Sequence, residues 1–198
     1  MRIFLSVLIL IFSLQSWTKA DDISDFEIEG ISIGDSLLGH FSVEDILSLG
    51  VTDYPNSKKY SRITLKKNTF VTYNDVQFHY LTNNKNFKIA SMSGGVYIHN
   101  DINKCLKKRD NVVDTVKTLF TNYKIKRADY DHPGDETRKS KVYEVSFVFD
   151  SGAEIRISCY DWSEELTKSK KWTDHLKVSP KSCCTVKEIL RKKVLVEL

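Results

Sequence analysis

Two runs of alternating apolar and polar residues flank the tripeptide Asp150-Ser151-Gly152 and constrain the fold more than any other stretch. Alternation with a period of two is typical of strands that bury one face. The apolar positions are Tyr143, Val145, Phe147 and Phe149 in the first run and Ala153, Ile155, Ile157 and Cys159 in the second. A three-residue turn ending in Gly pairs residue 149 with 153 and 145 with 157, so the two apolar faces coincide. The opposite face, which carries Arg156, is mostly polar and is predicted to lie in water.

Residues 101–122 supply the cover that this apolar face needs. Their apolar residues recur at helical spacing opposite a charged face, and they are Ile102, Cys105, Leu106, Val112, Val113, Val116, Leu119 and Phe120. This pattern predicts a helix that Asn100 or Asp101 caps and that packs on the hairpin. Cys105 then lies on the helix stripe and Cys159 on the apolar strand face, which predicts a disulfide between them. Two buried free thiols are the alternative.

Two further cysteines, Cys183 and Cys184, are neighbours in the chain and are left over by that pairing. An intermolecular bridge or a soft metal ion are both open to them. No His and no second Cys pair stands at a spacing typical of zinc ligands. The sequence therefore predicts no metal site and no cofactor.

A weaker copy of the same arrangement precedes this region. GISIGDSL (residues 30–37) aligns with GVYIHNDI (residues 95–102), and a capping box at Ser42 predicts a short helix over 43–49. Strand patterns follow at 60–65, 76–81 and 87–92. The predicted fold class is therefore α+β, an antiparallel sheet packed by helices. Two tandem helix-plus-three-strand units, residues 30–94 and 95–180, explain the alignment, and a coincidence of eight positions is the alternative.

The same reading divides the chain into a leader, residues 1–20, a single α+β domain, residues 21–180, and a C-terminal tail, residues 181–198. Two stretches show no clear period. Residues 129–140 lack large apolar side chains around a His-Pro-Gly-Asp turn and predict an exposed loop. Residues 185–198 fit either a short helix or a strand.

The N-terminus has the pattern of a signal peptide. One early charge, Arg2, precedes an apolar run from Ile3 to Leu14, and small or polar residues follow up to Ala20. Cleavage after Ala20 predicts a periplasmic or secreted protein, with no transmembrane segment in the mature chain. An uncleaved anchor is the alternative, although a spanning helix needs about 20 apolar residues.

Charge argues against a nucleic-acid partner. The chain carries a formal net charge of +4, and loss of Arg2 and Lys19 with the leader lowers it by two. Lysines and acidic residues are interspersed, whereas nucleic-acid binders concentrate a basic surplus on one face. The predicted partner is therefore an unknown protein or a small extracellular ligand.

Three segments carry a resemblance to known proteins. They are FEIEGISIGDSLL (residues 26–38), the HPGD turn (residues 132–135) and SFVFDSGAEIRISCYDWSEE (residues 146–165). Together they resemble a family of small exported proteins from marine bacteria over residues 1 to about 179. The resemblance implies export and a recurrent α+β unit, and it brings no activity. GISIGDSLL is also similar to the Gly-rich start of the first helix in outer-membrane assembly lipoproteins of the SmpA type and in the β-lactamase inhibitory protein.

The stretch Cys159-Tyr160-Asp161-Trp162 allows two interpretations. A carboxylate and an indole at a strand end form many sugar and peptide sites, which makes Asp161 and Trp162 binding candidates. Alternatively, Asp161 or Ser163 caps a helix that begins with Glu164 and Glu165 while Trp162 packs, and this structural interpretation is favoured. Arg156, Glu165, His132 and Asp135 complete the binding candidates, although a Pro-Gly turn alone accounts for His132 and Asp135.

No catalytic residue is predicted. Ser93, Ser151 and Ser163 lack the small flanking residues of a nucleophile elbow, and the five histidines show no metal-binding spacing. Two functions remain. The first is a non-catalytic envelope or extracellular binding module that uses the polar face of its sheet. The second is a small carboxylate-dependent hydrolase that acts on an extracellular polymer through Asp161, Glu164 and Glu165.

Overall fold

The computed structural model describes residues 23–54, 57–66, 70–181 and 194–195. The main feature of the fold is one eight-stranded antiparallel sheet in the order β3-β4-β5-β6-β10-β9-β8-β7. The strands are β3 (Thr52–Tyr54), β4 (Ser57–Lys66), β5 (Asp75–Leu81), β6 (Ile89–Tyr97), β7 (Tyr123–Asp131), β8 (Lys141–Phe149), β9 (Glu154–Asp161) and β10 (His175–Lys181). A small second sheet has the order β11-β1-β2, with β11 (Val194–Leu195), β1 (Phe26–Ile28) and β2 (Ile31–Ser32).

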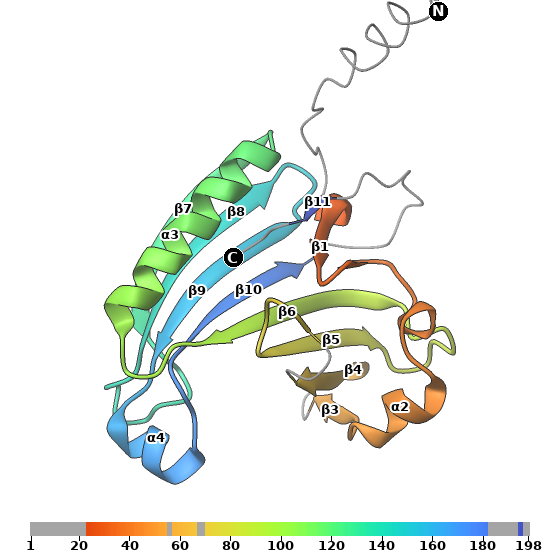
Figure 1. The fold of residues 1–198 in the computed structure, drawn as a ribbon, viewed down its shortest axis with the longest axis horizontal. Coiled ribbons are helices and arrows are strands. Elements are labelled where there is room, and N and C mark those ends of the chain that lie inside the picture. The colour runs from red at the N-terminus through yellow and green to blue at the C-terminus, as the bar shows by residue number, and fades with distance from the viewer. Residues whose placement is uncertain (1–22, 55–56, 67–69, 182–193, 196–198) are drawn as a thin grey trace, which may run out of the picture.

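The helices are α2 (Val43–Ser48), α3 (Ile102–Leu119) and α4 (Glu164–Lys170), with 3-10 turns η1 (Ile23–Asp25) and η2 (Leu37–Gly39). A sheet-dominated α+β fold is therefore confirmed (Figure 1). None of the helices within the described residues has the length and apolar character needed to cross a membrane.

The chain fills the sheet from both edges toward its centre. Strands β3 to β6 run from one edge to the middle, α3 carries the chain to the other edge, and β7 to β10 return until β10 pairs with β6. Each helix, α2 and α3, is followed by four strands, so the prediction of three was wrong. The proposed unit boundary at residues 94 and 95 also falls inside β6.

Strands β7 and β10 were not predicted from the sequence, for different reasons. In β7 almost every residue is exposed, so no apolar alternation marks it, and its last residues occupy the start of the predicted loop 129–140. In β10 the apolar residues Leu176 and Val178 do alternate with polar ones, and both are fully buried. The signal for β10 was present in the sequence, whereas the signal for β7 was absent.

The predicted hairpin is confirmed in its register. Val145 pairs with Ile157 and Phe147 with Ile155 across β8 and β9, and the Phe149 N–H donates to the Ala153 carbonyl at 3.0 Å. Gly152 closes the turn with φ of 79°, a left-handed conformation in which a Cβ is strained. The two apolar faces therefore coincide, as the alternation predicts.

Helix α3 covers this face, and its cap and disulfide match the sequence. The Asp101 side chain accepts a hydrogen bond from the Lys104 N–H at 2.9 Å. Cys105 and Cys159 form a disulfide with their Cα atoms 5.9 Å apart. Val112, Val113 and Val116 are buried along the same stripe. Burial of this stripe supplies most of what holds the helix, because isolated helices are marginal in water.

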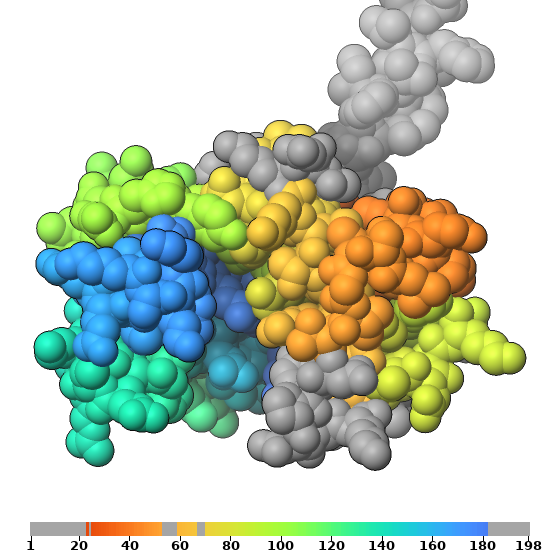
Figure 2. All heavy atoms as spheres, turned by 90° about the horizontal axis from the view of Figure 1, so that it is seen from below, coloured from red at the N-terminus to blue at the C-terminus, as the bar shows by residue number. Residues whose placement is uncertain are grey.

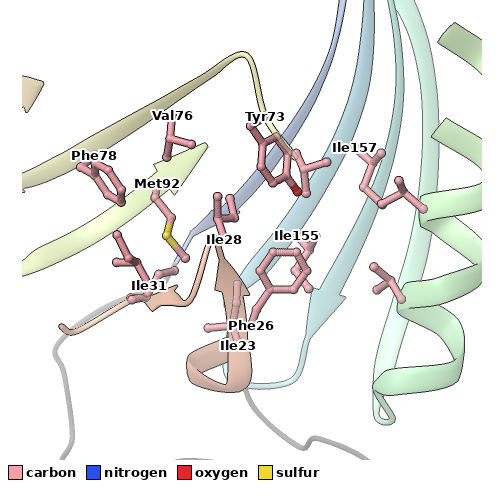
Figure 3. Packing of buried hydrophobic residues seen from close by; sticks show 14 of the residues in the cluster. Ile23, Phe26, Ile28, Ile31, Tyr73, Val76, Phe78, Met92, Ile155 and Ile157 are labelled. Carbon is pink, nitrogen blue, oxygen red and sulfur yellow. The ribbon is translucent and has the colours of Figure 1, made fainter. Parts of the chain in front are cut away.

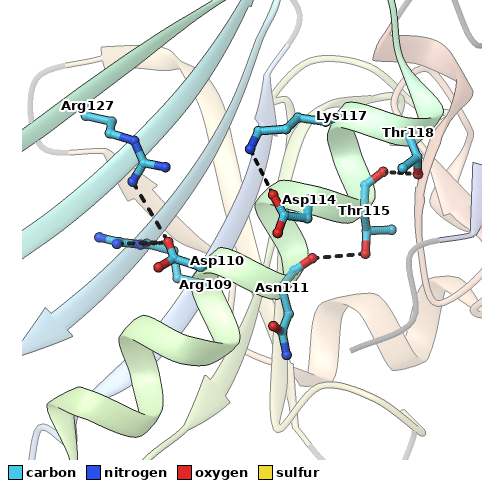
Figure 4. A network of polar contacts seen from close by, with 8 residues as sticks. All are labelled: Arg109, Asp110, Asn111, Asp114, Thr115, Lys117, Thr118 and Arg127. Atoms are coloured by element: carbon cyan, nitrogen blue, oxygen red, sulfur yellow. Dashed lines mark hydrogen bonds and ion pairs between the residues drawn. The ribbon is translucent and has the colours of Figure 1, made fainter.

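The outer face of α3 is held by ion pairs, which Figure 4 shows. The largely buried Arg109 side chain contacts Asp110 at 2.9 Å, and Arg127 of β7 lies 3.9 Å from the same carboxylate. One turn further, Lys117 pairs with Asp114 at 2.8 Å. Of these three contacts, the one between Arg127 and Asp110 links α3 to β7, and an exposed pair of this kind contributes about 0–1 kcal/mol.

Strand β1 joins both sides of the sheet in one core. In Figure 3, Phe26 and Ile28 lie between Val76, Phe78 and Met92 of β5 and β6 and Ile155 and Ile157 of β9. The Phe120 ring, just after α3, packs on Phe26 with centroids 6.1 Å apart. Glu29 follows β1 with φ of 54°, and its carboxylate accepts the N–H groups of residues 71–73 at 2.7 to 3.2 Å. All of this apolar mass lies on one face of the sheet.

Candidate ligand-binding groove

The opposite, polar face of the sheet encloses a groove instead of lying open to water. A cavity of about 670 Å³ is lined by residues of β4, β5, β6, β9 and β10 and by the segments on either side of α4. A second cavity of about 180 Å³ continues it and shares Ser93, Tyr160 and Lys177 with it. Figure 2 shows the hollow between α4, in bright blue, and the orange and yellow surface formed by the first strands and α2.

The hairpin face that was predicted to lie in water borders this groove. Ser146 and Ser158 are each only 4 % exposed, while Arg156 is half-buried beside them. The prediction of a polar face is therefore right, and the prediction that it lies in water is wrong. The reason is that residues of β5, β6 and β10, most of them distant in sequence, line the same cavity as Arg156 and Ser158.

Five rings form one side of the groove, and we call them the aromatic wall: His132, Tyr160, Trp162, Trp172 and His175. The Tyr160 and His175 rings stack with centroids 4.6 Å apart and planes 6° from parallel. Trp162 lies at the centre, 4.5 Å from Trp172 and 4.5 Å from His132. Such contacts between rings are worth about 0.5–1.5 kcal/mol each beyond burial, so the wall is preorganised.

The α4 region places the two tryptophans together. Ser163 caps α4 by accepting the Leu166 N–H at 3.4 Å, and Lys171 ends it with φ of 58°, which reverses the chain and returns Trp172 to Trp162. The backbone N–H of Trp162 donates to the Asp174 carboxylate at 2.8 Å. The predicted helix cap is thus present at Ser163, and Trp162 lines the cavity at the same time. Ser163 can therefore cap α4 while its neighbour Trp162 contacts a ligand.

Asp135 fixes the loop that carries His132. Its carboxylate accepts the N–H and hydroxyl groups of Thr137 at 3.0 and 2.7 Å and those of Ser140 at 2.9 and 2.6 Å. The hydrogen bonds from Ser140 and Thr137 hold the pKa of Asp135 well below its usual range. The Ser140 hydroxyl in turn accepts the Ser163 N–H at 2.9 Å. The predicted exposed loop is therefore anchored to the start of α4 through buried polar residues.

A row of cross-strand neighbours crosses the floor of the groove. Lys177 of β10 lies between Gly95 of β6 and Ser158 of β9, and the carboxylates of Asp75 and Glu144 stand one strand further out on either side. Both carboxylates have other partners: Asp75 accepts the Tyr97 hydroxyl at 2.6 Å, and Glu144 accepts the Ser158 hydroxyl at 3.1 Å.

The charges of the floor perturb its titrating groups. Burial is the largest cause that lowers the pKa of Lys177. Asp75 opposes it by raising the pKa, and Arg62 and Arg156 lower the pKa further. Burial, together with Lys177 and Arg62, lowers the pKa of His79 to about 4. Burial also lowers the pKa values of His132 and His175. Burial therefore favours the neutral form of His79, His132 and His175, and the permanent positive charge of the floor comes from Lys and Arg.

Three of the six predicted binding candidates line the groove: Arg156, Trp162 and His132. The other three do not. Asp161 lies opposite Lys141 on β8, and burial next to Asp174 raises its pKa. Glu165 is exposed on α4, and Asp135 is the loop anchor.

Sequence reasoning missed Arg62, Ser93, Trp172, His175 and Lys177, all of which line the main cavity. The alternation of His175, Lys177 and Ser179 in β10 was a usable signal. The sequence contained no signal that would bring Arg62 to the same place.

A scan against protein-family models, a search of curated proteins and a search of solved structures each found no match.

Proposed function

We propose that the protein is an exported, non-catalytic binding module that holds a partner protein or a small extracellular ligand in the groove. The observation that carries the proposal is the aromatic wall beside a cationic floor on a concave face. Ligand sites are concave and combine aromatic surface with a few placed polar groups, and Trp, Tyr and Arg dominate the energetics of protein interfaces.

The core does not need the groove side chains. The apolar face of the sheet is covered by α3 and β1, and its large residues are fully buried. In contrast, Trp172 is 38 % exposed and Lys177 is half-buried. Residues that break the rules of stable packing are expected at functional sites. The groove therefore has the character of a binding surface.

The hydrolase alternative is not carried further. Its three carboxylates, Asp161, Glu164 and Glu165, are absent from the residues that line the two cavities. A glycosidase requires two carboxyl groups about 5–10 Å apart around the scissile bond. The carboxylates that do line the groove, Asp75 and Glu144, already accept hydrogen bonds from Tyr97 and Ser158.

Export and internal duplication belong to the same proposal. The signal-peptide pattern, which lies outside the described residues, supports cleavage after Ala20 and a periplasmic or secreted location. The repeated order of one helix followed by four strands supports two tandem units that pair through β6 and β10. Intact-mass analysis of the protein from an envelope or culture fraction should show loss of residues 1–20, and a full-length mass there would refute cleavage.

Comparative capture tests the binding function. The mature protein and its Trp172→Ala variant are immobilised and exposed to the same envelope extract, and any species retained by the first is purified and measured by calorimetry. Ile125→Ala is the control, because Ile125 is similarly exposed at 41 % but lies on β7 at the sheet edge. We expect Trp172→Ala to weaken binding by about tenfold or more. If Trp172→Ala binds the captured species as tightly as Ile125→Ala and the unaltered protein do, the groove has no role in binding.

A further inference from the structure

We infer that the floor of the groove binds an oxyanion of the ligand, a carboxylate, phosphate or sulfate, between Lys177 and Ser93, with an attached ring against the aromatic wall. The inference rests on the proposed function, because it names the chemistry of the ligand that the groove holds. Three features carry it: the balance of charge in the groove, the buried Ser93 hydroxyl and the position of Lys177 beside Tyr160.

The lining of the groove is strongly positive. The two cavities together are lined by five cations, Arg62, Arg156, Lys171, Lys177 and Lys181, and by two carboxylates, Asp75 and Glu144. Of the five, Arg156 pairs with Glu154, at 3.0 Å. The ion pairs found within the described part of the chain include neither Arg62 nor Lys177. An anion is the complement that this lining requires.

The direct neighbours of Lys177 leave room for that anion. Gly95 and Ser158, which flank Lys177 in the sheet, carry no charge. Gly95 has no side chain, but the Asp75 carboxylate occupies the space above it, 2.7 Å from where a Cβ would lie. The room for a ligand anion is therefore on the side of Lys177 that faces Ser158 and Ser93. Burial of an ammonium group without a close counter-ion is unfavourable. Asp75 attracts Lys177 and raises its pKa, but the ion pairs of the described residues do not join the two side chains. A ligand oxyanion would supply a direct partner.

Ser93 gives independent evidence for a polar ligand. It lies on β6, is 4 % exposed and lines both cavities. Its hydroxyl has no hydrogen-bond partner within the described residues. Buried polar groups are nearly always hydrogen-bonded, so an unmatched hydroxyl at a cavity wall points to a bound group. The Ser93 hydroxyl can donate a hydrogen bond to an oxyanion, and Lys177 supplies the positive charge that attracts it.

The aromatic wall begins beside the same point. Tyr160 shares both cavities with Lys177 and Ser93, and His175, which stacks on Tyr160, precedes Lys177 by two residues and so faces the same way. The Trp162 indole Nε1 also lacks a partner in the described part of the chain. A ligand whose anionic group meets Lys177 can therefore place a ring against Tyr160 and Trp162.

Titration with small probes tests the inference. Phenylacetate, phenyl phosphate and phenyl sulfate are compared with neutral 2-phenylethanol on the mature protein, with amide and indole NMR shifts as the readout. We expect the best anionic probe to bind about tenfold tighter than 2-phenylethanol, since a charge-assisted hydrogen bond separates them. The shifts should centre on Ser93, Lys177, Tyr160 and Trp162. The tightest of the three anions identifies which oxyanion the site prefers.

Variants separate this site from general charge attraction. Lys177→Met should weaken the anionic probes about tenfold and leave 2-phenylethanol unchanged, and Lys177→Arg should retain most of the anion preference. Lys107→Met is the matched control, because Lys107 is an exposed lysine on α3. If a Lys177 variant does not fold, the comparison of anionic with neutral probes on the unaltered protein still tests the inference.

Two outcomes would overturn the inference. Equal affinity for 2-phenylethanol and the anions at the groove would refute the oxyanion site while leaving the groove as a ligand site. Anion-induced shifts confined to residues outside the groove would refute it as well. The wider binding function is decided separately, by the Trp172→Ala capture experiment.

Discussion

The two faces of the β8–β9 hairpin carry different residues and meet different surroundings. On one face Phe147, Ile155 and Ile157 are fully buried under α3 and β1. On the other, Ser146 and Ser158 are also buried, yet their neighbour Arg156 borders a cavity. Burial alone therefore does not separate core from site. The difference is that the first face is filled by apolar side chains, whereas the second surrounds open space with polar groups.

This contrast assigns separate tasks to the two faces. Burial of apolar area stabilises a fold by about 25 cal/mol per Å², and the apolar face contributes most of that area. The polar face keeps rings and cations half-exposed, where they add little to stability and remain available to a ligand. Substitutions on the apolar face should therefore affect unfolding, and substitutions on the groove face should affect binding.

Removal of a ring from the apolar face should have the largest effect. Phe147 is fully buried and packs edge-on against Tyr123 with centroids 4.9 Å apart. Phe147→Ala should lower the free energy of unfolding by about 3–5 kcal/mol, through lost burial and a cavity, as measured by urea denaturation. Ser146→Ala, the adjacent residue on the groove face, is the control and should cost about 1 kcal/mol. Similar losses for both would mean that the two faces are energetically alike.

Loss of the disulfide should come next. The Cys105–Cys159 bond joins residues 54 apart, and a loop of that size contributes roughly 4 kcal/mol as an upper estimate from chain entropy. The double variant Cys105→Ala, Cys159→Ala should unfold at lower urea with a loss of about 2–4 kcal/mol. Its groove should still bind the probes, because the bond lies on the apolar face. Unchanged stability would show that the cysteines are not bonded in solution.

A pH-dependent effect should follow from Asp135. Its pKa is lowered in the folded protein, so its contribution to stability is full above the unfolded pKa of about 3.9 and is lost as pH falls toward the folded value. Asp135→Asn should lower stability at neutral pH and reduce the loss of stability in acid. Tryptophan fluorescence should also change, because the same loop holds His132 against Trp162. An unaltered stability profile between pH 2 and pH 5 would contradict this role.

The smallest effect is expected for Arg156. It pairs with Glu154 on the groove face, and its side chain is 40 % exposed. Arg156→Ala should change the free energy of unfolding by only about 0.2–1 kcal/mol. A loss of several kcal/mol in the same urea experiment would show that the groove face is also part of what holds the fold together.

The sequence predicted those parts of the fold that show a local period. Alternation predicts the β8–β9 register and helical spacing predicts α3, so the two patterns together place Cys105 and Cys159 on facing surfaces. Strand β7 could not be predicted, because its side chains are exposed on both faces and leave no alternation. The four-strand count and the central pairing of β6 with β10 depend on contacts between distant segments.

The groove was less predictable than the fold. The sequence favours packing for Trp162, and in the structure this residue both packs against Trp172 and lines the cavity. Trp172 reaches it only because Lys171 adopts a left-handed conformation, which Lys does not favour and which no residue pattern announces. Arg62 and Lys177 come from opposite sides of the β5–β6 pair. Their proximity follows from sheet order, which local sequence does not encode.

A crystal structure of the mature protein soaked with phenyl phosphate would show directly whether the polar face of the sheet holds an anionic ligand. We expect density in the groove, with phosphate oxygens about 3 Å from the Lys177 ammonium and the Ser93 hydroxyl and the ring against Tyr160 and Trp162. The Phe147 side of the sheet should show no bound probe. An empty groove with the probe bound at another surface would contradict the assignment of the polar face as the ligand site.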